Sequence, residues 1–423
     1  MEKVVEKLNQ TCDSYSLSIT QTKSTMVKFA DSKVTIVQNW NVSNVSLLLT
    51  RRNKFMTSTF SSVEEMERNL SSLNEKLGLL EPTELVPLIS ESDKIVRVRN
   101  TDERISSAIT DPSPIVKVVL DSAESSLFGT LNLVETTRKL ITSAGFDGEE
   151  TRNYFVSYFR SIDRGRSGHW STVSSKYSDS SLASTVKKSA EYASIDGEAT
   201  LDEGRHDVVL SPSVFANLIE IIGYMSSAYN LMSSMSFLVK SKPGDNVASS
   251  KFSLNDIPKN DMVGSFNFDD EGTLTYNKPI IENGTLRTFL FNNSLAKKYN
   301  YKSTANAGWV EPRPWALEIG KGDVKEDSLL DGNLIFFNNN WYTRLQNYYE
   351  GQFSTVGRDA IIAFKDGKPI GRIKRARISD KLPCIINRIE GLSTDVYKQM
   401  WWEVEVPTIS PFALIKNVMI TKG

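Results

Sequence analysis

The feature that most constrains the fold is the alternation of apolar and polar residues in short runs that polar turns separate. In the N-terminal part, the alternating runs are residues 16–20, 26–29, 34–37 and 45–50. A period of two places successive side chains on opposite faces of a strand. This part of the chain therefore predicts an antiparallel meander.

Turn dipeptides extend the same prediction to the C-terminal part. Asn283-Gly284 and Asp366-Gly367 each lie between two apolar, strand-like runs. Asn-Gly and Asp-Gly supply the positive φ angles that two-residue hairpin turns require. Hairpins are therefore expected to dominate from residue 262 onward.

Helical patterns interrupt the strands at a few places. Residues 1–8 indicate a short amphipathic helix, and Ser62 with Glu65 forms an N-terminal capping signal for a helix that reaches Leu80. Further helices are expected near residues 115–126 and 182–194. Ser211 and Pro212 suit the first positions of a long helix whose apolar residues fall on one face.

These patterns predict an α+β protein with three units. Residues 1–82 are expected to form a mixed N-terminal domain with the meander and helices, and residues 83–206 a central mixed domain. Residues 207–423 are expected to form a mostly antiparallel β domain with one long helix. A chain of 423 residues is long enough for two to three such domains, each with its own core.

Charge and cysteine content exclude some classes of function and indicate a cellular compartment. The 50 Lys and Arg residues nearly cancel the 51 Asp and Glu residues, so no long-range field favours nucleic acid or an anionic membrane. Two cysteines at opposite ends of the chain fit a reducing compartment. The first residues alternate charged and apolar types, unlike a signal peptide, and polar residues interrupt the apolar segment 208–225. We therefore expect a cytoplasmic protein that does not enter the membrane.

Histidine is scarce, which limits the chemistry available. The chain contains only His169 and His206. Zinc hydrolases commonly use two or three imidazoles, and a Ser-His-Asp site needs one beside a nucleophile. His169 follows a Gly- and Arg-rich run and is expected in an exposed loop, whereas His206 is expected at a strand edge or on the surface. The Ser-x-x-Lys match at Ser184 carries little weight in so serine-rich a chain.

Several segments together resemble one known family. They are Val208-Val209-Leu210-Ser211-Pro212 before the long helix, Phe268-Asp269-Asp270-Glu271-Gly272, Ile281-Glu282-Asn283-Gly284-Thr285-Leu286, Ser303-Thr304-Ala305-Asn306-Ala307 and Gly351-Gln352-Phe353-Ser354. In this order and spacing they resemble the C-terminal domain of the TldD/PmbA family. Residues 26–49 also resemble the N-terminal meander of that family, except that Asn44-Val45-Ser46 replaces a Gly-rich turn.

The resemblance implies which branch of the family this chain is similar to. The TldD branch is a zinc-dependent peptidase that carries His-Glu-x-x-x-His on the long helix and a later cysteine. In this chain Glu220, Ile221 and Met225 occupy the three motif positions, and no cysteine lies near residues 399–403. A thioether is a poor zinc ligand, isoleucine has no proton to exchange, and one carboxylate alone does not make the site. The chain therefore resembles the TldE/PmbA branch, whose members lack the metal motif.

That likeness implies a subunit of a heteromeric protease. The chain itself is expected to hold no catalytic residue, no metal ligand and no cofactor. Zinc is expected in a TldD-type partner, with peptides as the substrate.

Aromatic residues and arginine indicate where contacts could lie. Protein interfaces are enriched in Trp, Tyr and Arg. The β-rich part concentrates these types, and the resulting candidates for a partner or chamber surface are Trp309, Trp315, Trp341, Tyr342 and Arg344. The same side chains could instead form sheet core.

The basic segment 365–381 leaves a second function open. It holds seven Lys and Arg residues against Asp366 and Asp380. Because the family was historically named as a modulator of DNA gyrase, the alternative is a nucleic-acid-binding or gyrase-associated protein without enzymatic activity. Ile370, Ile373 and Ile378 favour instead a solvated hairpin with one buried face.

Overall fold

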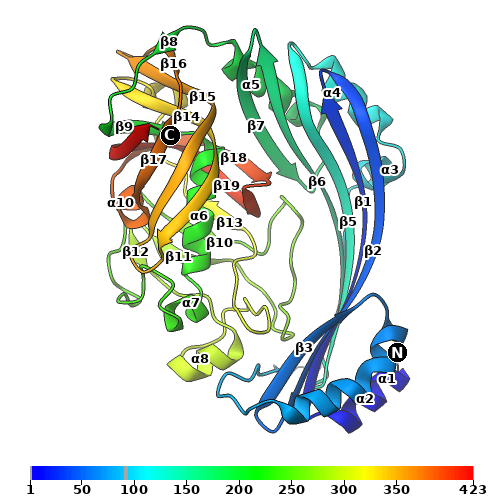
Figure 1. Ribbon diagram of the computed structural model, residues 1–423. Helices are drawn as coiled ribbons and strands as arrows, with labels where there is room; N and C mark the ends of the chain where they lie inside the picture. Colours follow the sequence, from blue (N-terminus) through cyan, green and yellow to red (C-terminus); the bar gives the residue numbers. More distant parts are fainter. Residues whose placement is uncertain (1, 90–93, 423) are drawn as a thin grey trace.

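The protein is described by a computed structural model that covers residues 2–89 and 94–422. Two sheets, each with its own helices, make up the fold (Figure 1). The helices are α1 (Glu2–Thr11), α2 (Val63–Leu79), α3 (Glu103–Thr110), α4 (Ser113–Asp121), α5 (Asp179–Ser194), α6 (Pro212–Met225), α7 (Ala228–Met232), α8 (Asn293–Tyr299), α9 (Glu326–Leu329) and α10 (Leu382–Asn387).

The N-terminal sheet has seven strands in the order β3-β2-β1-β5-β6-β4, with β7 also paired to β6. Its pairs are antiparallel except for β4 with β6. The strands are β1 (Ser14–Ala30), β2 (Lys33–Arg51), β3 (Lys54–Phe60), β4 (Ile95–Asn100), β5 (Ser126–Thr142), β6 (Asp147–Asp163) and β7 (Arg166–Ser174). Figure 1 shows these long strands as a tall, curved wall beside the C-terminal part of the molecule.

Helices cover the apolar patches of this sheet at its two ends. α1 and α2 pack near one end, where Leu8, Leu47 and Leu73 belong to one core cluster. α3, α4 and α5 enclose a second cluster that includes Phe155 and Phe159. The middle of the wall is left for contacts with the C-terminal part, and this is where the candidate site lies.

The C-terminal sheet has twelve strands in the order β12-β11-β10-β13-β19-β9-β14-β15-β16-β8, with β17 and β18 attached to β19. It is mixed, because β9 with β14, β13 with β19 and β8 with β16 pair in parallel. The strands are β8 (Glu198–Ala199), β9 (Gly204–Leu210), β10 (Leu254–Asp256), β11 (Lys278–Glu282), β12 (Thr285–Leu286), β13 (Leu317–Ile319), β14 (Leu334–Asn347), β15 (Gln352–Lys365), β16 (Lys368–Ile373), β17 (Ala376–Lys381), β18 (Ile389–Trp401) and β19 (Val404–Lys422).

The long helix α6 lies against this sheet and carries the residues that matter most below. Ser211 caps it by accepting a hydrogen bond from the Val214 N–H, and Pro212 takes the first turn, as the sequence predicts. The residues expected on its apolar face, Val214, Leu218, Ile222 and Met225, are all buried. They belong to the largest core cluster, together with residues of β9, β19 and α10.

The predicted α+β class is confirmed, as are the turns at Asn283-Gly284 and Asp366-Gly367. The division into units at residues 82 and 206 stays a prediction. β1 pairs with β5 over fourteen residues, so the first two predicted units share one sheet. No helix among the described residues is long and apolar enough to cross a membrane.

Candidate functional site

Two adjoining cavities lie where the middle of the N-terminal sheet meets loops of the C-terminal part. Their volumes are about 280 and 290 Å³. Four residues line both cavities, namely Arg152 of β6 and Phe266, Arg313 and Trp315 of the C-terminal part. We call the combined hollow the interdomain groove.

Aromatic and arginine side chains in contact form one wall of the interdomain groove. The Phe266 and Trp315 rings lie 4.9 Å apart between centroids, and the Arg152 guanidinium lies 4.1 Å from the Phe266 ring. The Trp315 indole N–H donates to the Ala305 carbonyl at 2.8 Å. Arg313, whose side chain is 52% exposed, lies 5.5 Å from the Trp315 ring. Flat aromatic faces with an exposed guanidinium suit an extended peptide.

Buried charges fix the floor of the groove. Glu150, which is almost fully buried, lies 3.2 Å from the Arg152 guanidinium and 3.7 Å from that of Arg138. Arg138 is also paired with Asp270 and donates to the Phe268 carbonyl. Arg138, Glu150 and Arg152 thus hold one another in place and bind the C-terminal loop to the sheet.

Asp269 organises the loop that carries this floor. Its buried carboxylate accepts hydrogen bonds from the N–H groups of Glu271, Thr273 and Ala307 at 2.9–3.2 Å. Burial raises the pKa of Asp269 to about 7, although these hydrogen bonds act against the shift. The same burial raises the pKa of Glu271, whose carboxylate accepts from the Asn293 N–H. The run quoted for the family resemblance is therefore a structural loop that shapes the groove.

Trp309 and Trp315, both predicted as surface candidates, lie at the interdomain groove. Trp309 has a left-handed backbone, with φ at 56°, and its indole N–H donates to the Asp270 carbonyl at 2.9 Å. It also reaches the Ser16 hydroxyl of β1 at 3.3 Å, so it bridges the two parts of the molecule. Trp315 is 5% exposed and serves the core as well as the groove.

Trp341, Tyr342 and Arg344 lie elsewhere, on the outer half of β14. Tyr342 is 52% exposed, and its N–H donates to the Glu403 carboxylate at 2.8 Å. The Arg344 guanidinium lies 5.6 Å from the Tyr342 ring, and the Trp341 and Tyr342 rings lie 4.5 Å apart. We call these three residues the β14 patch. The five predicted residues thus form two separate groups.

Glu220 on α6 is buried next to the groove. Its carboxylate accepts from the Glu405 and Val406 N–H groups of β19 at 2.9 and 2.6 Å. Burial raises its pKa to about 8, since the two hydrogen bonds do not offset the loss of water and the nearby carboxylates of Glu405 and Glu403 raise the pKa further. Glu405 and Val406 themselves line the groove.

The three positions of the degenerate zinc motif do not suit a metal. The Glu220 carboxylate is occupied by two backbone N–H groups, Ile221 offers no ligand atom, and Met225 is packed in the core. Within residues 2–89 and 94–422, no three His, Cys, Asp or Glu side chains gather as a metal site. The donor set of this chain therefore does not fit zinc, and no chemical step is assigned to it.

The expectation of an exposed loop at His169 is wrong. The turn consists of Arg164 and Gly165 alone, and His169 lies in β7, 4% exposed, with its ring 4.9 Å from that of Trp401. Its backbone pairs with the Asn338 side chain at 2.8 and 3.0 Å. Burial lowers the pKa of His169 to about 4, so the imidazole is neutral at physiological pH.

The other sequence candidates lie as follows. His206 is on β9 near the surface, as expected, and its Nε2–H donates to the Asp202 carbonyl at 2.8 Å. Cys384 is half-buried in α10. In the basic segment, Ile373 and Ile378 are buried but Ile370 is 53% exposed, so the single buried face predicted there begins only after Ile370.

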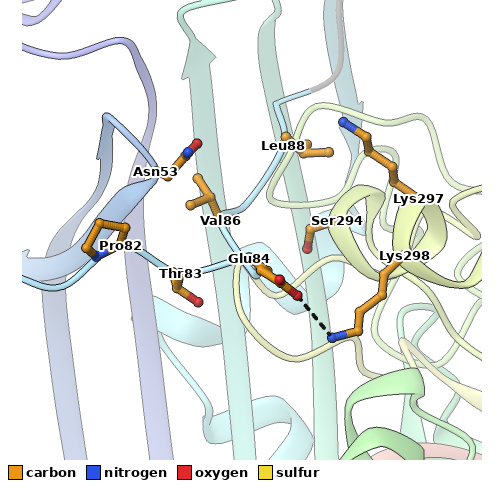
Figure 2. A pocket seen from close by; sticks show the side chains of 9 residues that line it. All are labelled: Asn53, Pro82, Thr83, Glu84, Val86, Leu88, Ser294, Lys297 and Lys298. Carbon is orange, nitrogen blue, oxygen red and sulfur yellow. Dashed lines mark ion pairs between the residues drawn. The ribbon is translucent and has the colours of Figure 1, made fainter.

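A further cavity of about 550 Å³ lies between the segment after α2 and helix α8. Figure 2 shows Glu84 and Lys298 facing each other across it, and their charged atoms are 3.9 Å apart. The pair is well exposed, so it contributes little free energy. Its lining comes from the first predicted unit, the start of the second and α8 of the C-terminal part.

Sequence reasoning missed the charged residues of the groove. Arg138, Glu150 and Arg152 lie on strands where alternating charged and apolar residues indicate only a solvated face. Asp269 stood within a recognised motif, which was the one available signal. The pairing of β5 and β6 with loops more than a hundred residues away could not be derived from spacing.

Comparisons with known proteins agree with this architecture. Residues 203–422 match the family model of the PmbA/TldA metallopeptidase C-terminal domain. Metalloprotease MJ0996 of Methanocaldococcus jannaschii is 24% identical over 370 residues, which are 79% of this chain and 81% of that protein.

Two solved structures show the same fold over the whole chain. TldE from Thermococcus kodakarensis has a TM-score of 0.85 at 15% identity and covers 100% of this chain and 99% of its own. TM0727 from Thermotoga maritima, a candidate modulator of a DNA gyrase, has a TM-score of 0.83 at 21% identity and covers 99% of this chain and all of its own.

Proposed function

Because the chain belongs to the PmbA/TldD metallopeptidase family, we propose that it is the subunit without a metal site in a heteromeric zinc-dependent metalloprotease. A TldD-type partner that carries His-Glu-x-x-x-His supplies the zinc and the general base. The substrates are small or unfolded peptides, and the complex acts in the cytoplasm.

The observation that carries the proposal is the state of the three motif positions on α6. Each has a structural use in place of a catalytic one. Glu220 joins α6 to β19, Ile221 packs against the core cluster and Met225 lies within it. The packing of α6 without a catalytic motif supports a chain that keeps the family fold in order to assemble with a partner. The full-length likeness to TldE from Thermococcus kodakarensis agrees with this interpretation.

The interdomain groove gives the subunit a role in substrate binding. Phe266 and Trp315 offer apolar faces for peptide side chains, and the exposed Arg313 offers a charged donor for a carboxylate. Asp270 lies 3.8 Å from Arg313 and neutralises it only in part, since it is shared with Arg138. The chain thus contributes a wall of the chamber in which a peptide is held.

Co-expression with a TldD-type protein from the same genome tests the proposal. We expect the two chains to purify as one complex that degrades casein or a fluorogenic peptide, whereas this chain alone shows neither bound zinc nor peptidase activity. Metal content is measured by mass spectrometry. One zinc per isolated chain, or a TldD-type protein whose activity is unchanged by this chain, would refute the subunit model.

A further inference from the structure

A separate, strongly basic cavity lies where β7, the segment after α5 and the strands β15 and β16 meet. Its volume is about 590 Å³. Six cationic side chains line it: Arg164, Arg166, Arg358, Arg372, Lys374 and Arg375. Three carboxylates, Asp196, Glu198 and Asp359, also line it, which leaves a formal excess of three positive charges. We call it the basic pocket.

The carboxylates are already committed to other groups. Asp196 is paired with Arg166 and accepts from the Gly197 N–H, and Glu198 lies 2.6 Å from Lys374. Asp359 is buried and pairs at 2.6 Å with Arg160, a residue that does not line the pocket. Asp163, next to the lining, pairs with Arg164 and Arg166. The positive charges that no carboxylate pairs with among the described residues are therefore those of Arg358, Arg372 and Arg375.

Arg372 gives the pocket a fixed shape. Its guanidinium donates to the carbonyls of Tyr192, Ile195 and Asp359 at 2.9–3.2 Å. These bonds connect the end of α5 to β15 and β16, so the pocket walls do not depend on a bound ligand. Carbonyl acceptors leave the charge of Arg372 in place, because they carry no formal charge.

Arg358 and Arg375 supply the charges that are free to meet a ligand. Within the described residues, neither side chain forms an ion pair with a carboxylate, and Arg375 has no hydrogen-bond acceptor. The Arg358 guanidinium lies 4.0 Å from the Trp341 ring, which orients it without neutralising it. Burial and the nearby Arg160 lower the pKa of Arg358, which is the effect that an added anion would reverse.

From this geometry we propose that the basic pocket binds the phosphoryl group of a small phosphate ester. Guanidinium groups match phosphate oxygens in paired hydrogen bonds, and a phosphate dianion needs more than one positive charge. Gly165, Gly197 and Gly357 also line the pocket, and small residues let a ligand approach the backbone. The site is independent of the proteolytic role proposed above.

Titration calorimetry of the full chain with inorganic phosphate, at constant ionic strength in sodium chloride, tests this proposal. We expect phosphate to bind at least about tenfold more tightly than acetate, since a monoanion satisfies fewer of the donors. Glycerol phosphate and a phosphoserine peptide are compared in separate titrations. The tighter-binding of these two compounds identifies whether the phosphoryl group comes from a metabolite or from a peptide. Equal heats of titration for phosphate and for chloride would overturn the proposal.

Charge-matched variants locate the site. Arg375→Glu is expected to weaken phosphate binding by about tenfold or more, whereas Lys368→Glu, on β16 but outside the pocket lining, changes the same net charge and leaves binding within about twofold. Arg358→Gln, a smaller change, is expected to weaken binding as Arg375→Glu does. The pocket is refuted if the Arg375 and Lys368 variants lose phosphate affinity equally. It is also refuted if both variants weaken the binding of an oligonucleotide to the same extent, because the anion would then be attracted by a diffuse charged surface.

Discussion

At the scale of single residues, Glu220 illustrates how burial changes the chemistry of a carboxyl group. A TldD-type enzyme has a zinc-binding histidine at this position, and here the side chain satisfies two N–H groups of β19 in the core. Its pKa of about 8 lies above the ordinary value of 4.5. The folded chain therefore holds a proton that the unfolded chain releases at neutral pH.

This shift makes a pH-dependent stability prediction. The raised pKa stabilises the fold fully below pH 4.5, and the contribution falls as the pH rises to about 8 and is then lost. Glu220→Gln cannot ionise and keeps an acceptor oxygen for β19. We expect the free energy of unfolding of the variant, relative to the parent chain, to rise by roughly 2–4 kcal/mol between about pH 5 and about pH 9.

Denaturant unfolding of both chains at several pH values measures this difference. Comparison with the parent chain cancels the contributions of Asp269 and Glu271, whose pKa values are also raised. Parallel curves for the two chains would show that Glu220 does not titrate in this range.

His169 shows what spacing cannot reveal about a residue. Only the Arg164-Gly165 turn is local, while the burial of His169 comes from Asn338 and Trp401, which lie far along the chain. The exposed-loop interpretation identified the turn correctly but extended it to His169, which lies in the following strand. Local sequence identifies a turn, but it does not show that a strand beside the turn is covered by residues of another sheet.

At the scale of elements, the signals that predicted correctly were those with a local physical cause. The Ser211 cap and the Asn-Gly and Asp-Gly turns depend on backbone geometry of a few residues. The full length of β1 and β2 was not predicted. The alternating run 34–37 indicates a strand with one buried face, whereas residues 33–44 of β2 are exposed throughout. These residues pair with β1 because the antiparallel ladder of the two strands continues through them.

Gly284 allows one such turn to be tested. Its φ is +80°, and an added Cβ would lie 2.4 Å from the Ala248 carbonyl oxygen, a backbone atom that cannot move cheaply. Gly284→Ala is expected to lower the free energy of unfolding by about 2–4 kcal/mol. Gly244 is the matched control, since its φ is +102° and nothing lies within 4 Å of an added Cβ.

We expect Gly244→Ala to cost about 1 kcal/mol from backbone strain alone. Chemical denaturation measures both variants against the parent chain. An equal loss for the two would mean that the close approach at Gly284 relaxes without cost.

At the scale of the whole molecule, the two groups of predicted aromatic residues have different surroundings. Trp309 and Trp315 lie at the interdomain groove, between the two parts of one chain. Tyr342 and Arg344 of the β14 patch face solvent on the outer half of β14. Aromatic side chains and arginine that remain exposed are typical of protein interfaces, whereas those in a groove are typical of ligand contacts.

This separation predicts distinct effects in the complex with a TldD-type partner. In the β14 patch, the double variant Tyr342→Ala and Arg344→Ala is expected to weaken assembly by about tenfold or more. Tyr and Arg are enriched among the few interface residues whose truncation costs about 2 kcal/mol or more. In the groove, Arg313→Ala is expected to leave assembly intact and to raise KM for peptides with a free carboxylate. Because the Arg313 side chain is half exposed, its truncation is expected to leave the fold intact.

Analytical ultracentrifugation measures assembly, and peptide turnover with acidic and neutral substrates measures the groove. Lys325→Ala serves as the control, because this exposed residue borders neither the β14 patch nor the interdomain groove. If the β14 variants assembled normally while Arg313→Ala prevented assembly, the roles of the two surfaces would be exchanged. The partner would then dock over the groove, and the β14 patch would be an exposed edge of the C-terminal core.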